Sequence, residues 1–211
     1  MRNPRPMVLA GLLALALAGA GAPAASAAGF TVTSSAISGP SETGFDSGLM
    51  SAGRLDAQYA AGGVGPGNPK SFPFSWSNVP ARTRALALIL DDPDARPILA
   101  SRGIKAPSFL HWTAADIDPS LGGLPADASA SSPSFVQGKN GAGQPGYRGP
   151  QPPADFPPNT GKRLVHIYRL ALFALSSPTG LKDGFTLDEL KSAMKGRILG
   201  QAELNISYSN D

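Results

Sequence analysis

The 211-residue sequence contains no cysteine and only two histidines, and each shortage excludes a class of site. Without cysteine there is no disulfide framework, no thiol chemistry and no zinc site built from Cys and His. With two histidines, a two-His-plus-carboxylate set is the most that a metal ion could find. We therefore expect no metal and no cofactor, and a fold that depends on packing alone.

Charge is also scarce, and no cluster of lysine and arginine occurs anywhere in the chain. The sequence has 18 basic and 15 acidic residues. Two of the arginines lie in residues 1–27, which contain no acid, so the remainder has 16 basic and 15 acidic residues and a net charge of +1. This balance gives no basic face for nucleic acid, which we do not expect as a partner.

The N-terminus has the layout of a secretory signal. Arg2 and Arg5 precede the apolar run Met7–Ala20, and the small residues Ala25–Ala27 follow. This pattern predicts a Sec-type signal peptide at residues 1–27, cleaved to give a periplasmic or secreted protein. The alternative is an uncleaved anchor, but the run is short. No later stretch approaches the ~18 apolar residues of a spanning helix, so we expect no stable membrane insertion after cleavage.

Residues 28–211 are long enough for one domain with a sizeable core. The 25 glycines and 21 prolines suit a loop-rich β protein. We expect a long surface excursion over 39–69 and one clear helix over 185–198, which Thr186 and Glu189 begin with a capping box. Strands are predicted at 29–37, 72–76, 84–91, 108–114, 164–175 and 202–208.

Two of these strands have a predicted place in a sheet. The segment 84–91 (RALALILD) has apolar residues on both faces, which is typical of a central, buried strand. The segment 72–76 (FPFSW) contains Pro73, which cannot donate to a ladder, so we expect it at a sheet edge.

The few special polar residues follow or lie within apolar strands. Asp92 and Asp94 come where Pro93 ends the central strand, and His111 lies in a strand beside Trp112. His166 and Tyr168 are two residues apart, so they share one face of their strand, and the glycine-rich loop 138–149 can expose backbone N–H groups to an oxyanion. Each pattern also has a purely structural interpretation: a turn, a core histidine, cross-strand packing or a plain loop.

Taken in order, several motifs resemble the phosphatidylethanolamine-binding protein superfamily, especially its bacterial branch of Raf-kinase-inhibitor-like (YbhB/YbcL-type) proteins. The matching segments are SFPFSWSNVP (71–80), LALILDDPDA (86–95), FLHW (109–112), PGYRGPQPP (145–153), HIYRLALFAL (166–175) and MKGRILGQAELNISYS (194–209).

The resemblance implies a mostly β, single-domain, sandwich-like fold. It has a large antiparallel sheet, long loops, one or two short helices in the C-terminal half and a small cavity at one end. Family members bind phosphate-like groups there, including phospholipid headgroups. The residues that it assigns to ligand binding here are Asp92, Asp94, His111, His166 and Tyr168, with Gly146, Tyr147, Gly149 and Pro150 as a wall. A histidine beside a carboxylate favours its charged form, so we expect the histidines to offer N–H donors to the anion.

The sequence departs from the family pattern near this cavity. Arg96 stands where a proline is usual, and Ile167 replaces an arginine between His166 and Tyr168. Arg96 either adds an anion contact or points to solvent, and the segment 98–107 is expected to alter the cavity entrance. These changes leave the identity of the ligand open.

A binding protein without catalytic activity fits the sequence best. We find no Gly-x-Ser-x-Gly elbow, metal cluster or cofactor fingerprint. The rival functions are an acid/base hydrolase that uses the same cavity, a protein-inhibitory module whose partner is for example a protease, and an exported domain with a vestigial cavity.

Overall fold

The computed structural model describes residues 29–46, 52–61, 70–131, 134–158, 161 and 163–210. The predicted signal peptide at 1–27 lies outside these ranges. Within them, no helix is long and apolar enough to cross a membrane.

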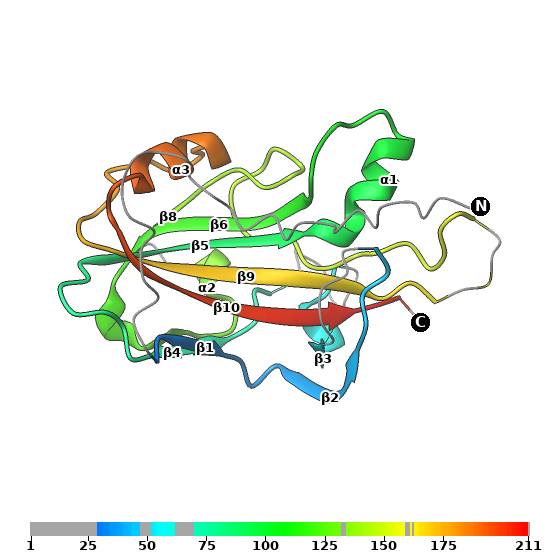
Figure 1. Ribbon diagram of the computed structural model, residues 1–211, viewed down its shortest axis with the longest axis horizontal. Helices are drawn as coiled ribbons and strands as arrows, with labels where there is room; N and C mark the ends of the chain where they lie inside the picture. The colour runs from blue at the N-terminus through cyan, green and yellow to red at the C-terminus, as the bar shows by residue number, and fades with distance from the viewer. Residues whose placement is uncertain are drawn as a thin grey trace, which may run out of the picture.

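The fold is built on a seven-stranded sheet with the order β2-β3-β10-β9-β5-β6-β8, faced by a three-stranded sheet with the order β1-β4-β7 (Figure 1). The parallel pair β3–β10 makes the large sheet mixed, whereas its other pairs are antiparallel, as expected. The strands are β1 (Thr31–Thr33), β2 (Ile37–Glu42), β3 (Ala52–Leu55), β4 (Phe74–Ser77), β5 (Ala85–Asp92), β6 (Phe109–Ile117), β7 (Gly123–Leu124), β8 (Val136–Gln137), β9 (His166–Leu175) and β10 (Ile198–Tyr208).

Short helices connect the strands. The described residues form α1 (Arg96–Ser101), α2 (Ala128–Ser131) and α3 (Leu187–Met194), with 3₁₀ turns η1 (Ala57–Tyr59), η2 (Pro93–Ala95) and η3 (Pro119–Leu121). The capping box predicted for α3 is confirmed, since the Thr186 side chain accepts from the Glu189 amide and the Glu189 carboxylate accepts from the Thr186 amide. α1 was not predicted. It begins directly after η2 with a proline in its first turn, where the missing N–H costs nothing.

The central position predicted for 84–91 is confirmed. β5 pairs with β9 on one side and β6 on the other, and all its residues are buried. Leu86, Leu88 and Leu90 face the core shared with the small sheet, whereas Ala87 and Ile89 face a second core under α3. Figure 1 shows these layers, with α3 on one face of the large sheet and β1 and β4 on the other.

Two predictions about the N-terminal half were wrong. β4 lies in the middle of the small sheet, between β1 and β7, because Pro73 precedes the strand and removes no donor from its ladders. The segment 39–69 includes most of β2 and all of β3, so it is not one structureless excursion. β2 is polar and mostly exposed along its length, so hydrophobic alternation could not reveal it.

Candidate functional site

The order of three strands brings the predicted site residues together. Asp92 ends β5, which lies between the strand that carries His111 and the strand that carries His166. His166 is the first residue of β9, and β9 is antiparallel to β5, so its start meets the end of β5. α1 lies at this same end of the sheet, at the right of Figure 1.

Asp92 is the centre of the cluster. One of its oxygens, Oδ2, lies 2.8 Å from Nδ1 of His166 and 3.9 Å from Nε2 of His111. The other oxygen accepts from the Ala95 amide at 3.1 Å. The carboxylate therefore orients the His166 ring and closes the turn after β5.

Two buried polar atoms of β9 have no hydrogen-bond partner within the described part of the chain, namely Nε2 of His166 and the hydroxyl of Tyr168. Both residues are 1% exposed. The His111 ring lies edge-on to the Tyr168 ring at 5.0 Å between centroids. Buried polar atoms in native proteins nearly always have a hydrogen-bond partner. Two atoms without one on the same face of a strand therefore mark a place where a polar ligand is expected.

Burial sets the protonation of this cluster, and it corrects one expectation. It lowers the pKa of His111, and the nearby Asp92 carboxylate only partly offsets that effect. His111 is therefore neutral at pH 7, contrary to the charged form expected from its acidic neighbour. Its Nδ1 donates to the Arg148 carbonyl at 2.7 Å. Burial also raises the pKa of Tyr168 well above its usual value, so its hydroxyl keeps the proton.

Asp94 lies beside the cluster, but its oxygens are already used. One oxygen accepts from the Asp46 amide at 2.6 Å and the other from the Ile167 amide at 2.8 Å. The side chain is fully buried. These contacts give Asp94 an evident structural role at the start of β9, and its predicted contact with a ligand stays a prediction.

The glycine-rich loop is fixed to η1 rather than free. Tyr147 donates its hydroxyl to the Tyr59 carbonyl at 2.8 Å, and its ring packs against Trp112 in the main core, where burial raises its pKa. Gly149 passes so close to the backbone of η1 that an added Cβ would lie 2.6 Å from the Ala61 nitrogen. Pro150 accepts from that same nitrogen at 2.8 Å.

The loop reaches the cluster through Arg148. Besides the bond from His111, the Arg148 amide donates to the His111 carbonyl at 2.8 Å. Gly146 has a φ of 95°, a left-handed conformation that glycine adopts without strain, and it precedes this contact by two residues. The ligand wall expected from Gly146, Tyr147, Gly149 and Pro150 stays a prediction.

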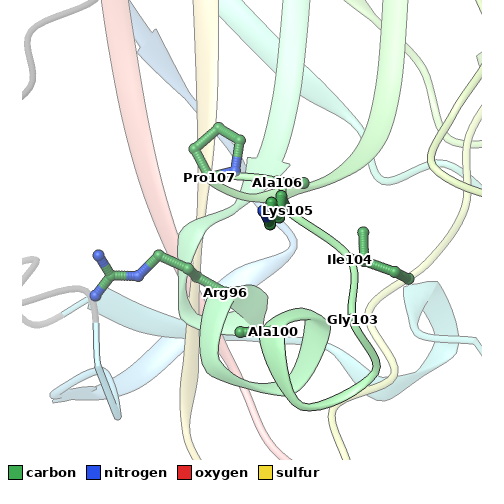
Figure 2. A pocket seen from close by; sticks show the side chains of 7 residues that line it. All are labelled: Arg96, Ala100, Gly103, Ile104, Lys105, Ala106 and Pro107. Atoms are coloured by element: carbon green, nitrogen blue, oxygen red, sulfur yellow. The ribbon is translucent and has the colours of Figure 1, made fainter.

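The residues after Asp94 shape the surface at this end. An open hollow of about 460 Å³ lies between α1 and the loop to β6, and Figure 2 shows the side chains of Arg96, Ala100, Gly103, Ile104, Lys105, Ala106 and Pro107 that line it. The Arg96 guanidinium points away from the other residues of the hollow. It pairs with the Asp46 carboxylate at 2.7 Å.

Sequence reasoning missed Phe45, Asp46 and the Arg148 backbone. Phe45 stacks on the His166 ring, with 6.3 Å between centroids and 8° between planes. No motif marks these residues, because Phe45 and Asp46 lie in the glycine- and serine-rich stretch and a carbonyl contact has no side-chain signature. Among the residues that the structure describes, no three His, Cys, Asp or Glu side chains gather to hold a metal ion.

Comparison with known proteins gives consistent matches. A family model described as phosphatidylethanolamine-binding protein matches residues 46–209. A UPF0098 protein of Methanothermobacter thermautotrophicus is 35% identical over 155 residues, which cover 72% of this chain and 88% of the relative. An uncharacterized protein of Bacillus subtilis, YxkA, is 33% identical over 144 residues, which cover 66% and 82% of the two chains.

Two crystal structures share the fold. A putative phosphatidylethanolamine-binding protein homolog from Chlamydia trachomatis has a TM-score of 0.66 and 29% identity, and the match covers 87% of this chain and 99% of the other. YbcL of Escherichia coli, described as a new member of the mammalian PEBP family, has a TM-score of 0.65 and 25% identity, covering 87% and 100%.

Proposed function

Since the chain belongs to the phosphatidylethanolamine-binding protein family, we propose that it is an exported, non-catalytic protein that binds a small phosphate-like anion at the Asp92–His111–His166–Tyr168 cluster. The single observation that carries this proposal is that two buried polar atoms on the same face of β9, His166 Nε2 and the Tyr168 hydroxyl, have no hydrogen-bond partner among the described residues. An anion that accepts hydrogen bonds would satisfy both atoms if Nε2 carries a proton.

The remaining contacts of the cluster favour binding over catalysis. Asp92 already bonds to His166 and to the Ala95 amide, and the His111 ring is tied to the Arg148 carbonyl. Groups held in this way orient a ligand, whereas a general base must reach the proton that it removes. Hydrogen bonds to His166 Nε2 and to the Tyr168 hydroxyl would together hold one tetrahedral oxyanion.

Export is supported by the basic and apolar start of the sequence. It is tested by producing the full chain in a bacterium with a periplasm and measuring the mass of the protein in each fraction. A periplasmic product that has lost about 27 residues agrees with the proposal. A full-length product in the cytoplasm contradicts it.

The binding proposal is tested by calorimetric titration with inorganic phosphate and with phosphoethanolamine. Tyr168→Phe removes one hydroxyl and keeps the ring, so we expect roughly tenfold weaker binding, the loss of one hydrogen bond of ~1.4 kcal/mol. Tyr59→Phe is the matched control, because Tyr59 is a buried tyrosine of η1, whereas Tyr208 pairs directly with His166 across the sheet. It should bind like the wild type.

Flat titrations for a folded wild type would refute anion binding at this site. Hydrolysis of a phosphoester panel that is lost in His111→Ala would instead support the enzymatic alternative. Stoichiometric inhibition of a secreted serine protease, unaffected by Tyr168→Phe, would support a protein-interaction module.

A further inference from the structure

Phe45 and Asp46, which follow β2, lie against the buried cluster. The Phe45 ring is stacked on the His166 imidazole, with 6.3 Å between centroids, and its amide donates to the Val165 carbonyl at 2.9 Å. Phe45 is 39% exposed, whereas His166 beneath it is 1% exposed. One aromatic ring therefore separates the imidazole from solvent on this side.

Phe45 also has an aromatic neighbour on the opposite loop. The Phe156 ring meets it edge-on, with 6.3 Å between centroids and 85° between planes. Edge-to-face pairs of this kind stabilise a fixed ring orientation. The wall over His166 is thus held by contacts with two separate segments of the chain.

Asp46 fastens this wall at two points. Its amide donates to Asp94 Oδ1 at 2.6 Å, and its carboxylate pairs with the Arg96 guanidinium at 2.7 Å. Asp94 and Arg96 lie within four residues of the end of β5. The residues after this central strand therefore hold Phe45 and Asp46 in place over the start of the neighbouring strand, β9. The Asp94 bond has a fully buried acceptor, whereas the Arg96 and Asp46 side chains are 60% and 30% exposed.

The two attachments differ in strength. An exposed ion pair contributes little and is screened by salt, and its loss does not disturb the core. A hydrogen bond to a buried carboxylate is stronger and keeps the backbone in place. The hydrogen bond to Asp94 therefore keeps Asp46 in place, whereas the ion pair with Arg96 can break more easily. We call the Arg96 contact the latch.

The cluster itself is closed. Asp92 is 3% exposed, His111 4%, and His166 and Tyr168 1% each. A ligand larger than a few heavy atoms has no room at such a site unless a wall moves. Phe45 and Arg148 each contact a histidine of the cluster and are exposed, but Phe45 makes its contact through its side chain, whereas Arg148 bonds to His111 through its backbone.

We propose that Phe45 and Asp46 form a latched cover over the anion site, and that this cover selects inorganic phosphate over phosphoesters with larger substituents. The inference rests on the proposed function, because it concerns access to the same site. Arg96 acts in it as a positioning residue that holds Asp46, and Phe45 is the element that determines ligand size.

The test compares three ligands on four proteins. Inorganic phosphate, phosphoethanolamine and glycerophosphoethanolamine are titrated calorimetrically into the wild type, Phe45→Ala, Arg96→Ala and Arg102→Ala. The last is the matched control, because Arg102 is an exposed arginine next to α1 that makes no ion pair within the described residues.

We expect the wild type to prefer phosphate over glycerophosphoethanolamine. Phe45→Ala should reduce this preference about tenfold, and Arg96→Ala about threefold, which is the change that loss of an exposed ion pair gives. Hydrogen exchange of the Asp46 amide should become faster in Arg96→Ala at low salt, whereas Arg102→Ala should match the wild type in both measurements.

The outcomes separate the two proposals. If the wild type binds phosphate and both cover variants keep its selectivity, the cover is refuted and the anion site stands. The same conclusion follows if the wild type binds the two esters as tightly as phosphate. If no ligand binds the wild type, the anion site is refuted, and the selective cover with it.

Discussion

The two ends of the central strands are equally buried, but they bury different chemistry. Where β5 begins and β9 ends, the paired residues are Ala85 with Leu175 and Leu86 with Ala174. At the other end, the buried side chains include Asp92, His166 and Tyr168. The same sheet, with the same hydrogen-bond ladder, therefore builds a plain hydrophobic core at one end and a polar cluster at the other.

The side chains at the two ends meet different requirements. At the apolar end each side chain has only to fill space, and its contribution comes from area removed from water. At the polar end each group also needs a partner, and a buried polar group without one lowers stability. Within the described residues, two such groups of the cluster lie on one face of β9, His166 Nε2 and the Tyr168 hydroxyl, which is expected where function requires them.

The largest effect should follow a cavity at the apolar end. Leu86 is fully buried in the core between the two sheets, so Leu86→Ala should lower the free energy of unfolding by about 3 kcal/mol through lost burial and the cavity. Urea unfolding measures this change. Phosphate affinity of the folded variant should equal that of the wild type, and a parallel loss of affinity would contradict the separation of the two ends.

A smaller effect should appear with pH at the polar end. Burial lowers the pKa of His111 in the folded state, whereas the unfolded value is about 6.5. Below pH 6.5 the unfolded chain therefore binds more protons, and stability falls as pH decreases toward the folded pKa. The slope contributed by His111 is at most ~1.4 kcal/mol per pH unit.

Urea unfolding at pH 7, 6 and 5 checks this effect against His111→Gln. The groups that influence His111 are Asp92, Asp91 and Arg148. All three remain in the variant, so the difference between the two proteins isolates the histidine. We expect the stability of the wild type to decline more steeply with acid, and equal slopes for the two proteins would show that His111 does not govern the decline.

The same contrast explains what the sequence could predict. Apolar residues on both faces indicated β5, high β propensity indicated β9, and the strand predicted at 202–208 covers the later part of β10. The capping box likewise located α3, because Thr186 and Glu189 interact within one turn. Family motifs indicated Asp92, His111 and His166, and the strand order then explained their meeting at one end.

What could not be predicted depends on contacts between distant segments. Phe45 meets His166 across more than a hundred residues, and neither neighbour in sequence hints at the stacking. The lowered pKa of His111 is likewise a consequence of its burial, which outweighs the adjacent carboxylate. β2 was missed because its polar residues lie on an edge that buries little.

The smallest expected effect concerns the hydroxyl of Tyr168. Tyr168 is as buried as Leu86, but its hydroxyl has no partner among the described residues. Tyr168→Phe removes a hydroxyl that makes no stabilising hydrogen bond in the ligand-free fold. We therefore expect the free energy of unfolding to stay the same or to rise by up to about 1 kcal/mol. Urea unfolding without phosphate measures it, with Tyr59→Phe as control. A loss of more than about 1 kcal/mol would mean that the hydroxyl has a structural partner, and the orphaned pair that identifies the site would then be reduced to His166 Nε2.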